Sequence, residues 1–159
     1  ASMTPAETIA AAVSERIAEG WTWWRSLGRR RAIAAEVEAI AARFGLSDVL
    51  DANTPHLPYG KQRLLEIAVA FASRPRVLLL DEPAAGVPEA ERRGLLETVA
   101  ALPRDVSVLL IEHDMDLVFS FAERISVLVN GALFAEGSVD EVANDPRVRA
   151  VYLGEDEHG

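Results

Sequence analysis

The chain has 159 residues, half of them apolar and 26% charged, and its mean hydropathy is +0.10, which excludes a disordered segment and a large multidomain protein. Its net charge is −9, with the acidic excess in residues 81–159, so we expect neither nucleic acid nor an anionic membrane surface as a partner. It has no cysteine, no run of about 18 apolar residues and no basic segment before an apolar stretch at its start. We therefore expect no disulfide, no membrane span and no signal peptide, and a protein soluble in the cytoplasm.

The first part of the chain predicts helices. A capping box at Thr4-Pro5-Ala6-Glu7 opens one helix, which has apolar residues at helical spacing and ends at Gly20. A second helix is expected over residues 33–44, ended by Gly45, and a third over residues 60–72. Together these segments predict a helical subdomain over residues 1–75.

A different pattern begins at Arg76. Short apolar runs at residues 76–80 and 106–111 predict two strands, each buried on both faces of a parallel sheet. Helices are expected after them, over residues 89–102 and 114–122. Because strands that alternate with helices are typical of an α/β layer architecture, we expect residues 76–159 to form one.

The last part of the chain predicts a hairpin and two short helices. Strands over residues 125–129 and 132–135 flank Asn130-Gly131, a pair typical of a tight antiparallel turn, which we expect at the edge of the sheet. A second capping box, Ser138 to Glu141, opens a short helix. The final helix is expected from Pro146 to Leu153, before an acidic tail.

Two adjacent acids, Asp81 and Glu82, follow the first predicted strand. Ligands of open parallel sheets bind at the carboxyl ends of the strands, so these acids are expected at the active edge. Mg²⁺ takes carboxylate oxygens together with substrate phosphates, which suits one acid to the metal and the other to an attacking water. The alternative is that both acids simply leave the strand into a solvated loop.

A histidine follows the second predicted strand. Val106 to Ile111 runs into Glu112-His113-Asp114, so His113 is expected at the same edge, where it would meet a phosphate oxygen or orient a water. A lone histidine at a strand end is more often an ordinary polar loop residue.

A glycine-containing loop leads into the third predicted helix, over Leu57-Pro58-Tyr59-Gly60-Lys61-Gln62-Arg63. Helix amino termini expose N–H groups and the positive end of a dipole, so this junction can receive a phosphate, with Lys61 adding charge. Taken alone, the loop is better explained as a plain helix start.

The order of these features resembles that of a known family. The segments LPYGKQRLLEIAVAFASRPRVLLLDEPAAGV and VLLIEHDMDLV resemble the second part of the ATPase domain of ATP-binding cassette (ABC) transporters. Within that family, PYGKQRLLEIA, DEPAAG, EHDMDLV and the closing Val151-Tyr152-Leu153-Gly154-Glu155 look most like the ATPase subunits of branched-chain amino-acid importers. The resemblance implies an α/β fold: half of a P-loop NTPase-like parallel-sheet core, with an all-helical subdomain on its N-terminal side.

The resemblance also implies roles for individual residues. Leu57 to Lys61 take the place of the signature loop, which caps the γ-phosphate of ATP held by the opposite subunit of a dimer. Asp81 would serve Mg²⁺ through water, Glu82 would be the general base that polarises the attacking water, and His113 would sense the γ-phosphate. The residues after Pro83 would form a loop that crosses the dimer interface. The expected nucleotide contacts are Pro58, Tyr59, Gly60, Lys61 and Gln62.

Two positions depart from the family pattern. Pro58 replaces the common signature serine and supplies neither a hydroxyl nor an N–H, so phosphate contact is left to Gly60, Lys61 and nearby backbone groups. Pro88 stands where the crossing loop usually carries an acid or an amide, which removes a side chain used in communication between the two sites.

A third departure from the family pattern is the absence of the phosphate loop G-x-x-x-x-G-K-[ST] from this sequence. The backbone N–H groups of that loop cradle the phosphates. The only Gly-Lys pair is Gly60-Lys61, which is followed by Gln62, and Pro55 stands at the place of the first glycine. We therefore interpret the chain as a fragment with half an ATP site, and we expect it to be inactive alone.

The function expected from the resemblance is ATP hydrolysis that powers import of branched-chain amino acids. The expected partners are a second ATPase subunit and transmembrane permease subunits, and the expected place is the inner face of the plasma membrane. The alternatives are a non-catalytic interaction module derived from a cassette ATPase, and a soluble cassette ATPase that is not coupled to transport.

Residues 21–31 (WTWWRSLGRRR) are predicted to be an aromatic and basic connector. Stacking and charge suit nucleic acid, but the net charge of −9 argues against it. A packed helix corner with a solvated basic edge is the ordinary interpretation. Contact with the transmembrane subunit, on which the family's helical subdomain docks, is the functional one.

Overall fold

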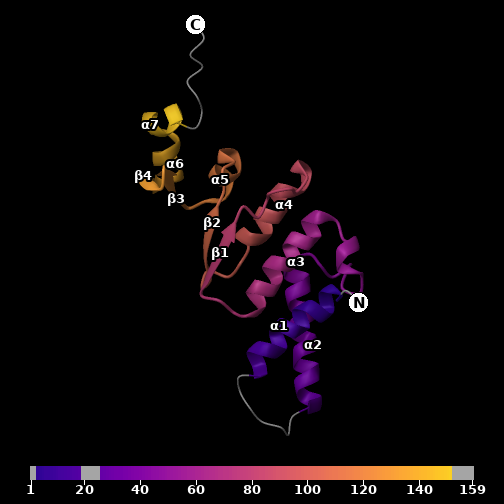
Figure 1. Ribbon diagram of the computed structural model, residues 1–159. Coiled ribbons are helices and arrows are strands. Elements are labelled where there is room, and N and C mark those ends of the chain that lie inside the picture. The colour runs from indigo at the N-terminus through magenta and orange to yellow at the C-terminus, as the bar shows by residue number, and fades with distance from the viewer. Residues whose placement is uncertain (1–2, 19–25, 152–159) are drawn as a thin grey trace. The chain divides into compact units, whose positions relative to one another are not determined.

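The computed structural model describes residues 3–18 and 26–151 and divides into two units, the first ending at Ile111 and the second beginning at Glu112 (Figure 1). The division predicted at residue 75 concerns subdomains and stays a prediction. In the described ranges, every helix is too short or too polar to cross a bilayer.

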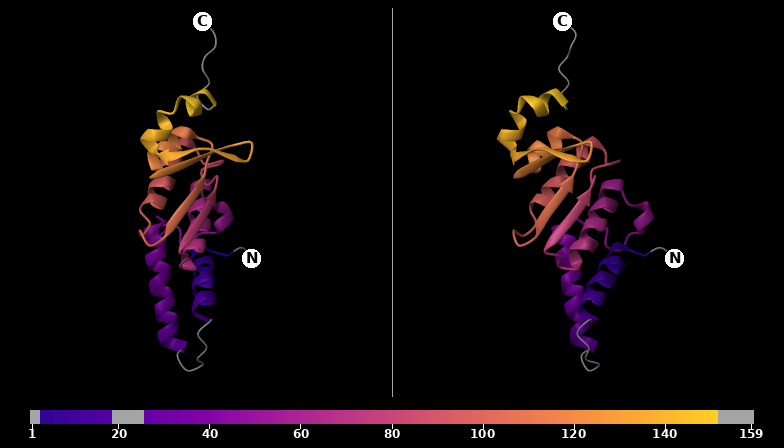
Figure 2. Two further views of the ribbon diagram at one scale, coloured as in Figure 1. Left: turned by 90° about the vertical axis from the view of Figure 1, so that its left-hand side faces the viewer. Right: turned by 60° about the vertical axis from the view of Figure 1, so that its left-hand side comes forward.

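The first unit begins with helices α1 (Pro5–Ala18), α2 (Ser26–Arg43) and α3 (Tyr59–Ala72), with a short 3₁₀ helix at Thr54–His56 before α3. The capping box at the start of α1 is confirmed: the Thr4 N–H donates to Glu7 Oε2 at 2.9 Å, and the Glu7 N–H donates to Thr4 Oγ1 at 3.2 Å. α1 contacts both α2 and α3, and Figure 2 shows α1 and α2 side by side. The fully buried side chains of this bundle include Ile9, Val13, Phe44 and Leu46.

The predicted connector is partly wrong. Ser26 to Arg31 form the first turns of α2, seven residues before the predicted start at Ile33. Leucine and arginine favour helix, but Gly28, Arg30 and Arg31 are exposed, so this stretch carries no apolar periodicity for a sequence pattern to detect. The three tryptophans and Arg25 of the connector lie outside the described residues.

Strands β1 (Val77–Asp81) and β2 (Ser107–Ile111) pair in parallel, joined by α4 (Glu89–Ala100). The register places Val77 opposite Ser107 and Asp81 opposite Ile111. This confirms the predicted parallel pair and its crossover helix, and it brings the carboxyl ends of both strands to one edge.

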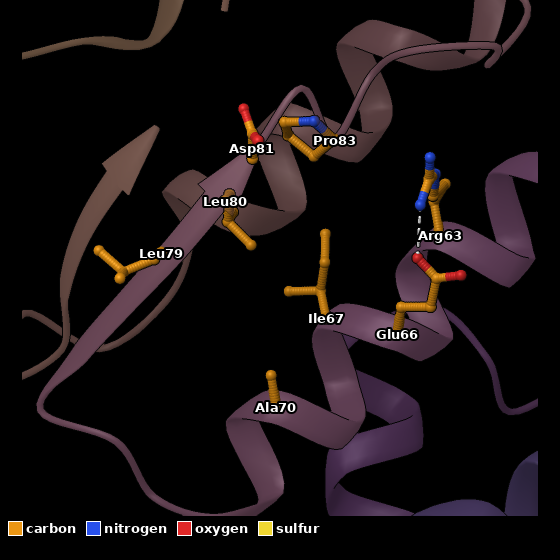
Figure 3. Close-up of a pocket in the computed structure, with 8 residues that line it drawn as sticks. All are labelled: Arg63, Glu66, Ile67, Ala70, Leu79, Leu80, Asp81 and Pro83. Carbon is orange, nitrogen blue, oxygen red and sulfur yellow. Dashed lines mark hydrogen bonds and ion pairs between the residues drawn. The ribbon is translucent and has the colours of Figure 1, made fainter. Parts of the chain in front are cut away.

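Burial of these strands on both faces is contradicted. Leu78 and Leu80 are 4% and 8% exposed, whereas Leu79, on the opposite face of β1, is 69% exposed. Figure 3 shows Leu80 pointing toward α3 and Leu79 pointing away from it. A continuous apolar run does not reveal which face the chain's own helices cover, and here they cover one. The exposed apolar residues of this face are Val77, Leu79, Leu109 and Ile111.

The second unit contains α5 (Met115–Phe121), β3 (Arg124–Val129), β4 (Ala132–Ser138), α6 (Val139–Ala143) and α7 (Pro146–Arg149). β3 and β4 form the predicted antiparallel hairpin, with Asn130 and Gly131 both at positive φ, 52° and 77°. The second capping box is confirmed by the reciprocal bonds of Ser138 and Glu141. The core of this unit gathers around Ile125, Val127, Val142 and Val148.

The predicted position of the hairpin is wrong for the described residues. β3 and β4 form a two-stranded sheet of their own instead of an edge of the β1–β2 sheet. The two-residue turn pairs β3 with the strand that follows it, so β3 finds its partner locally.

Candidate functional site

The acid pair lies where β1 ends. Asp81 is the last residue of the strand, and the Glu82 N–H continues the ladder by donating to the Ile111 carbonyl at 2.9 Å. Glu82 has φ of 43°, a left-handed conformation that costs a residue with a side chain about 1–2 kcal/mol. Such positions gather at functional sites, because the surrounding structure must hold them in place. Both acids are exposed, so their carboxylates are accessible to a ligand.

The backbone after the acid pair is tightly folded. The Ala85 N–H donates to the Glu82 carbonyl at 3.0 Å, and the Val87 N–H donates to the Ala84 carbonyl at 3.1 Å. Arg92 Nε, from α4, donates to the Val87 carbonyl at 2.9 Å. Pro83, Ala84 and Val87 are buried. Residues 84–88, called the crossing loop below, are therefore a stiff continuation of Glu82.

The donor set suits magnesium held together with phosphate. Among residues 3–18 and 26–151, no three His, Asp or Glu side chains form a cluster that could hold a metal ion by themselves. Mg²⁺ commonly takes one or two carboxylates and completes its octahedron with waters and phosphate oxygens. The exposed Asp81 carboxylate fits that arrangement.

The signature loop leads into an open helix start. Pro58 is the N-cap of α3 and provides no side-chain cap, so the first bond is from the Gln62 N–H to the Pro58 carbonyl at 3.1 Å. The N–H groups of the first turn have no partner within the helix, and together with the dipole they favour an anion. Gln62 Nε2 donates to the Leu57 carbonyl at 2.8 Å, which closes the loop on itself.

Lys61 points toward the end of α2. Its ammonium group donates to the Gly45 carbonyl and to Asp48 Oδ1, the latter at 2.8 Å. The first bond gives a hydrogen-bond donor to the Gly45 carbonyl, just past the end of α2. The second holds the pKa of Asp48 below its usual value, chiefly through the Lys61 hydrogen bond. The Lys61 ammonium group, which was expected to add charge at the phosphate, thus binds Gly45 and Asp48 in this conformation. Its contact with nucleotide stays a prediction.

The signature loop touches the crossing loop and the start of α4. A Cβ built on Gly86 would lie 3.0 Å from Cε1 of Tyr59, and one built on Gly60 would lie within van der Waals overlap of Glu91 Oε2. Tyr59 and Gly60 of the signature loop thus meet segments that follow the acid pair. The acid pair and all the predicted nucleotide contacts belong to the first unit. These residues are Asp81, Glu82, Pro58, Tyr59, Gly60, Lys61 and Gln62.

His113 belongs to the second unit. It lies just before α5, whose N-cap Asp114 accepts a hydrogen bond from the Leu117 N–H at 3.2 Å. The expected approach of His113 to the acid pair stays a prediction.

A cavity of about 220 Å³ opens between α3 and β1 (Figure 3). On the α3 side, Arg63 Nη1 donates to Glu66 Oε2 at 2.7 Å, which raises the pKa of Arg63. Asp81 is among the residues that line the opposite wall. Sequence reasoning missed Arg63, although its spacing of three from Glu66 is the signal of a helical ion pair. The lining residues are Arg63, Glu66, Ile67, Ala70, Leu79, Leu80, Asp81 and Pro83.

Comparison with known proteins gives two family matches. A family described as "ABC transporter" matches residues 2–85, and one described as "Branched-chain amino acid ATP-binding cassette transporter" matches residues 132–158. The matches cover the signature loop and acid pair in one case and the β4 to C-terminal region in the other.

Curated relatives agree with the family matches. The chain is 43% identical over 115 residues to the high-affinity branched-chain amino acid transport ATP-binding protein LivG of Salmonella typhimurium, which covers 71% of this chain and 45% of the relative. It is 44% identical over 112 residues to BraF of Pseudomonas aeruginosa, covering 69% of this chain and 44% of that protein. The matched region thus spans less than half the length of these relatives.

Solved structures confirm the predicted fold class. The structure of the ADP conformation of MJ1267, an ATP-binding cassette of an ABC transporter, matches with a TM-score of 0.72 at 29% identity. The match covers 97% of this chain and 64% of that one. The α/β arrangement described above is therefore the P-loop NTPase-like one that the motifs predicted.

Proposed function

Since this chain belongs to the ABC transporter family, we propose that it is part of an ATP-binding and ATP-hydrolysing subunit that powers import of branched-chain amino acids. The observation that carries the proposal is Glu82, an exposed acid held at φ of 43° directly after a parallel strand and bonded to the neighbouring strand. A carboxylate on a backbone held in this way is suited to orient an attacking water.

Asp81 and Glu82 divide the work in this proposal. Asp81 would hold Mg²⁺ through a water, and the ion, when bound, would neutralise phosphate charge. Glu82 accepts the hydrogen bond of the water that attacks the γ-phosphate. The stiff crossing loop and the Ile111 carbonyl fix the backbone on both sides of Glu82, which limits the positions its carboxylate takes.

The signature loop acts across a dimer of two such subunits. Its open helix start, with the N–H groups of Tyr59, Gly60 and Lys61, receives the γ-phosphate of ATP held by the opposite subunit. Pro58 contributes only shape, because it has no N–H and no hydroxyl. Gln62 holds the loop closed. His113 has the role of sensing a γ-phosphate in this proposal.

The solute class is supported by the match of residues 132–158 to the branched-chain amino acid transporter family and by the names of the LivG and BraF relatives. The proposal places the subunit under transmembrane permease partners, at the cytoplasmic face of the membrane. This match also favours a transport subunit over a soluble cassette ATPase that is not coupled to transport.

The test is Glu82→Gln in the full-length subunit that carries this chain. The substitution keeps the shape of the side chain and removes the charge that activates the water, so ATP affinity is expected to persist while turnover falls about 10²–10⁴-fold. Glu97→Gln, an exposed acid on α4, is the matched control and is expected to keep full turnover. Turnover of Glu82→Gln within a few-fold of the parent contradicts the assigned role, and a parent that hydrolyses no ATP supports a non-catalytic module instead.

A further inference from the structure

The ring of Tyr59 lies against the backbone of Gly86, where two functional segments meet. Gly86 has φ of 74°, and a Cβ at that position would lie 3.0 Å from Cε1, 3.4 Å from Cζ and 3.5 Å from the hydroxyl oxygen of Tyr59. The contact is therefore tight enough that only a residue without a side chain fits without moving the ring. Tyr59 is the first residue of α3, and Gly86 belongs to the crossing loop.

The ring is held from its own helix as well. The guanidinium carbon of Arg63 lies 5.3 Å from the centre of the Tyr59 ring, a cation–π distance, and Arg63 is in turn bonded to Glu66 at 2.7 Å. An aromatic ring fixed on one side by a cation and on the other by backbone has little freedom to rotate away. Tyr59 thus connects α3 to Gly86 as a rigid spacer, although it is 42% exposed.

The segment between Gly86 and the acid pair is held in place by backbone hydrogen bonds. Three residues separate Gly86 from Glu82, and this turn is closed by the Ala85 to Glu82 and Val87 to Ala84 hydrogen bonds. Ala84 and Val87 are buried, so the turn is anchored and does not fold independently of its surroundings. A backbone shift at Glu82 therefore moves Gly86, and through the tight contact it moves the ring of Tyr59.

We propose that Tyr59 is a positioning residue that couples the signature loop to the acid pair of the same subunit, by transmitting the position of the Glu82 backbone through Gly86 to the start of α3. The inference rests on the proposed function, in which the signature loop serves one ATP and Glu82 another. It gives each subunit an internal link between the two ATP sites of a dimer. The link is the contact between the Tyr59 ring and Gly86. It does not depend on the polar side chain that Pro88 replaces in the crossing loop.

The kinetic test uses the full-length subunit. Tyr59→Ala removes the spacer and is expected to lower kcat about tenfold while KM for ATP stays within about twofold, since the contact aligns reacting groups and binds no nucleotide base. Tyr59→Phe keeps the ring and is expected to restore the turnover that alanine loses. Gly86→Ala is expected to lower kcat through the same contact. Gly94→Ala is the matched control, because a Cβ there meets nothing within 4 Å.

The double variant separates the contact from backbone strain. Gly86→Ala carries a conformational cost at φ of 74° whatever Tyr59 does, but the steric part exists only while the ring is present. The loss in kcat of the Tyr59→Ala, Gly86→Ala double variant is therefore expected to be smaller than the product of the two single losses. Independent, multiplicative losses overturn the coupling, as does a Tyr59→Ala subunit with the parent's kcat.

A spectroscopic test on the 159-residue chain needs no activity. The chain has two tyrosines, so fluorotyrosine labelling of the Tyr152→Phe variant leaves one ¹⁹F resonance, that of Tyr59. Gly86→Ala is expected to shift this resonance and Gly94→Ala to leave it in place. An unmoved resonance in Gly86→Ala overturns the contact itself. A parent subunit without ATPase activity overturns the proposed function and with it the role of Tyr59, even where the resonance shifts, so the two failures are told apart.

Discussion

Glu36 of α2 is connected to α1 and to the end of α3 through two arginines, and its replacement by glutamine has a stability cost that follows from the geometry. Glu36 Oε2 accepts from Arg16 Nη2 at 2.6 Å, and Glu36 Oε1 accepts from Arg74 Nη2 at 3.0 Å. Arg16 also donates from Nε to the Ala72 carbonyl at 2.9 Å, so it ties the end of α3 to this network.

The two ion pairs differ in burial, and therefore in how much they contribute to the free energy of unfolding. The side chains of Arg16 and Glu36 are 22% and 21% exposed, which makes their charged hydrogen bond worth about 1.5–3 kcal/mol. Arg74 is 67% exposed, and such surface pairs contribute about 0.2–1 kcal/mol. Glu36→Gln is therefore expected to lower the free energy of unfolding by about 2 kcal/mol, or the melting temperature by about 4–8 °C.

The assay is thermal and urea unfolding of the 159-residue chain, followed by far-UV circular dichroism. Glu38→Gln is the control, since Glu38 is exposed on the same helix and its loss is expected to stay within about 0.5 kcal/mol. Arg74→Gln is expected to cost less than Glu36→Gln. Equal melting temperatures for the Glu36 and Glu38 variants would refute the reasoning, because they would show that the half-buried pair has no net value.

Three further predictions concern other parts of the chain. Gly45→Ala is expected to cost about 1–2 kcal/mol in urea unfolding, because Gly45 has φ of 62° and its Cβ would meet nothing within 4 Å, so the cost is conformational; equal stability to the Gly94→Ala variant would contradict this. Bonds from Arg147 lower the pKa of Asp145 from 3.8 to about 2, so its contribution to stability is present above about pH 4 and is lost as the pH falls toward 2; Asp145→Asn is expected to flatten the melting temperature across that window, and an unchanged slope would disprove it. Leu79→Asn is expected to reduce self-association of the 159-residue chain in light scattering, since Leu79 is 69% exposed on the open sheet face; a parent that stays monomeric at all concentrations would count against this.

Local signals predicted the two capping boxes and the hairpin. The capping boxes at Thr4 and Ser138 depend only on residues three positions apart, and the structure contains the bonds of both. The Asn130-Gly131 turn likewise needs only its own two residues to accept positive φ. These features were predictable because the partners are adjacent in the sequence.

Features that depend on distant partners were not predictable in the same way. The apolar run of β1 is equally compatible with one covered face or two, and the exposure of Leu79 depends on which face α3 packs against. Lys61 carried a charge that fitted a phosphate, yet its ammonium group contacts Asp48 and the Gly45 carbonyl, which a helical pattern does not reveal.

Some features of the candidate site were predictable from the sequence, and others were not. The order of glycine loop, acid pair and histidine identified the family, and the matches to the ABC transporter families agree. The left-handed backbone of Glu82 and the contact of Tyr59 with Gly86 had no sequence signal of their own.

The deepest burial in the first unit lies in its helices, and this has a consequence for the order in which the chain is made. Ile9 and Val13 of α1 and Phe44 just after α2 are fully buried, and α1 already contacts α2 and α3. All of these residues are synthesised before β1. A helical core of short sequence separations can thus assemble during translation, whereas the parallel pair must wait for α4 and β2 to be completed. The acid pair would therefore reach its final backbone conformation only after α3, which begins in the signature loop, has formed.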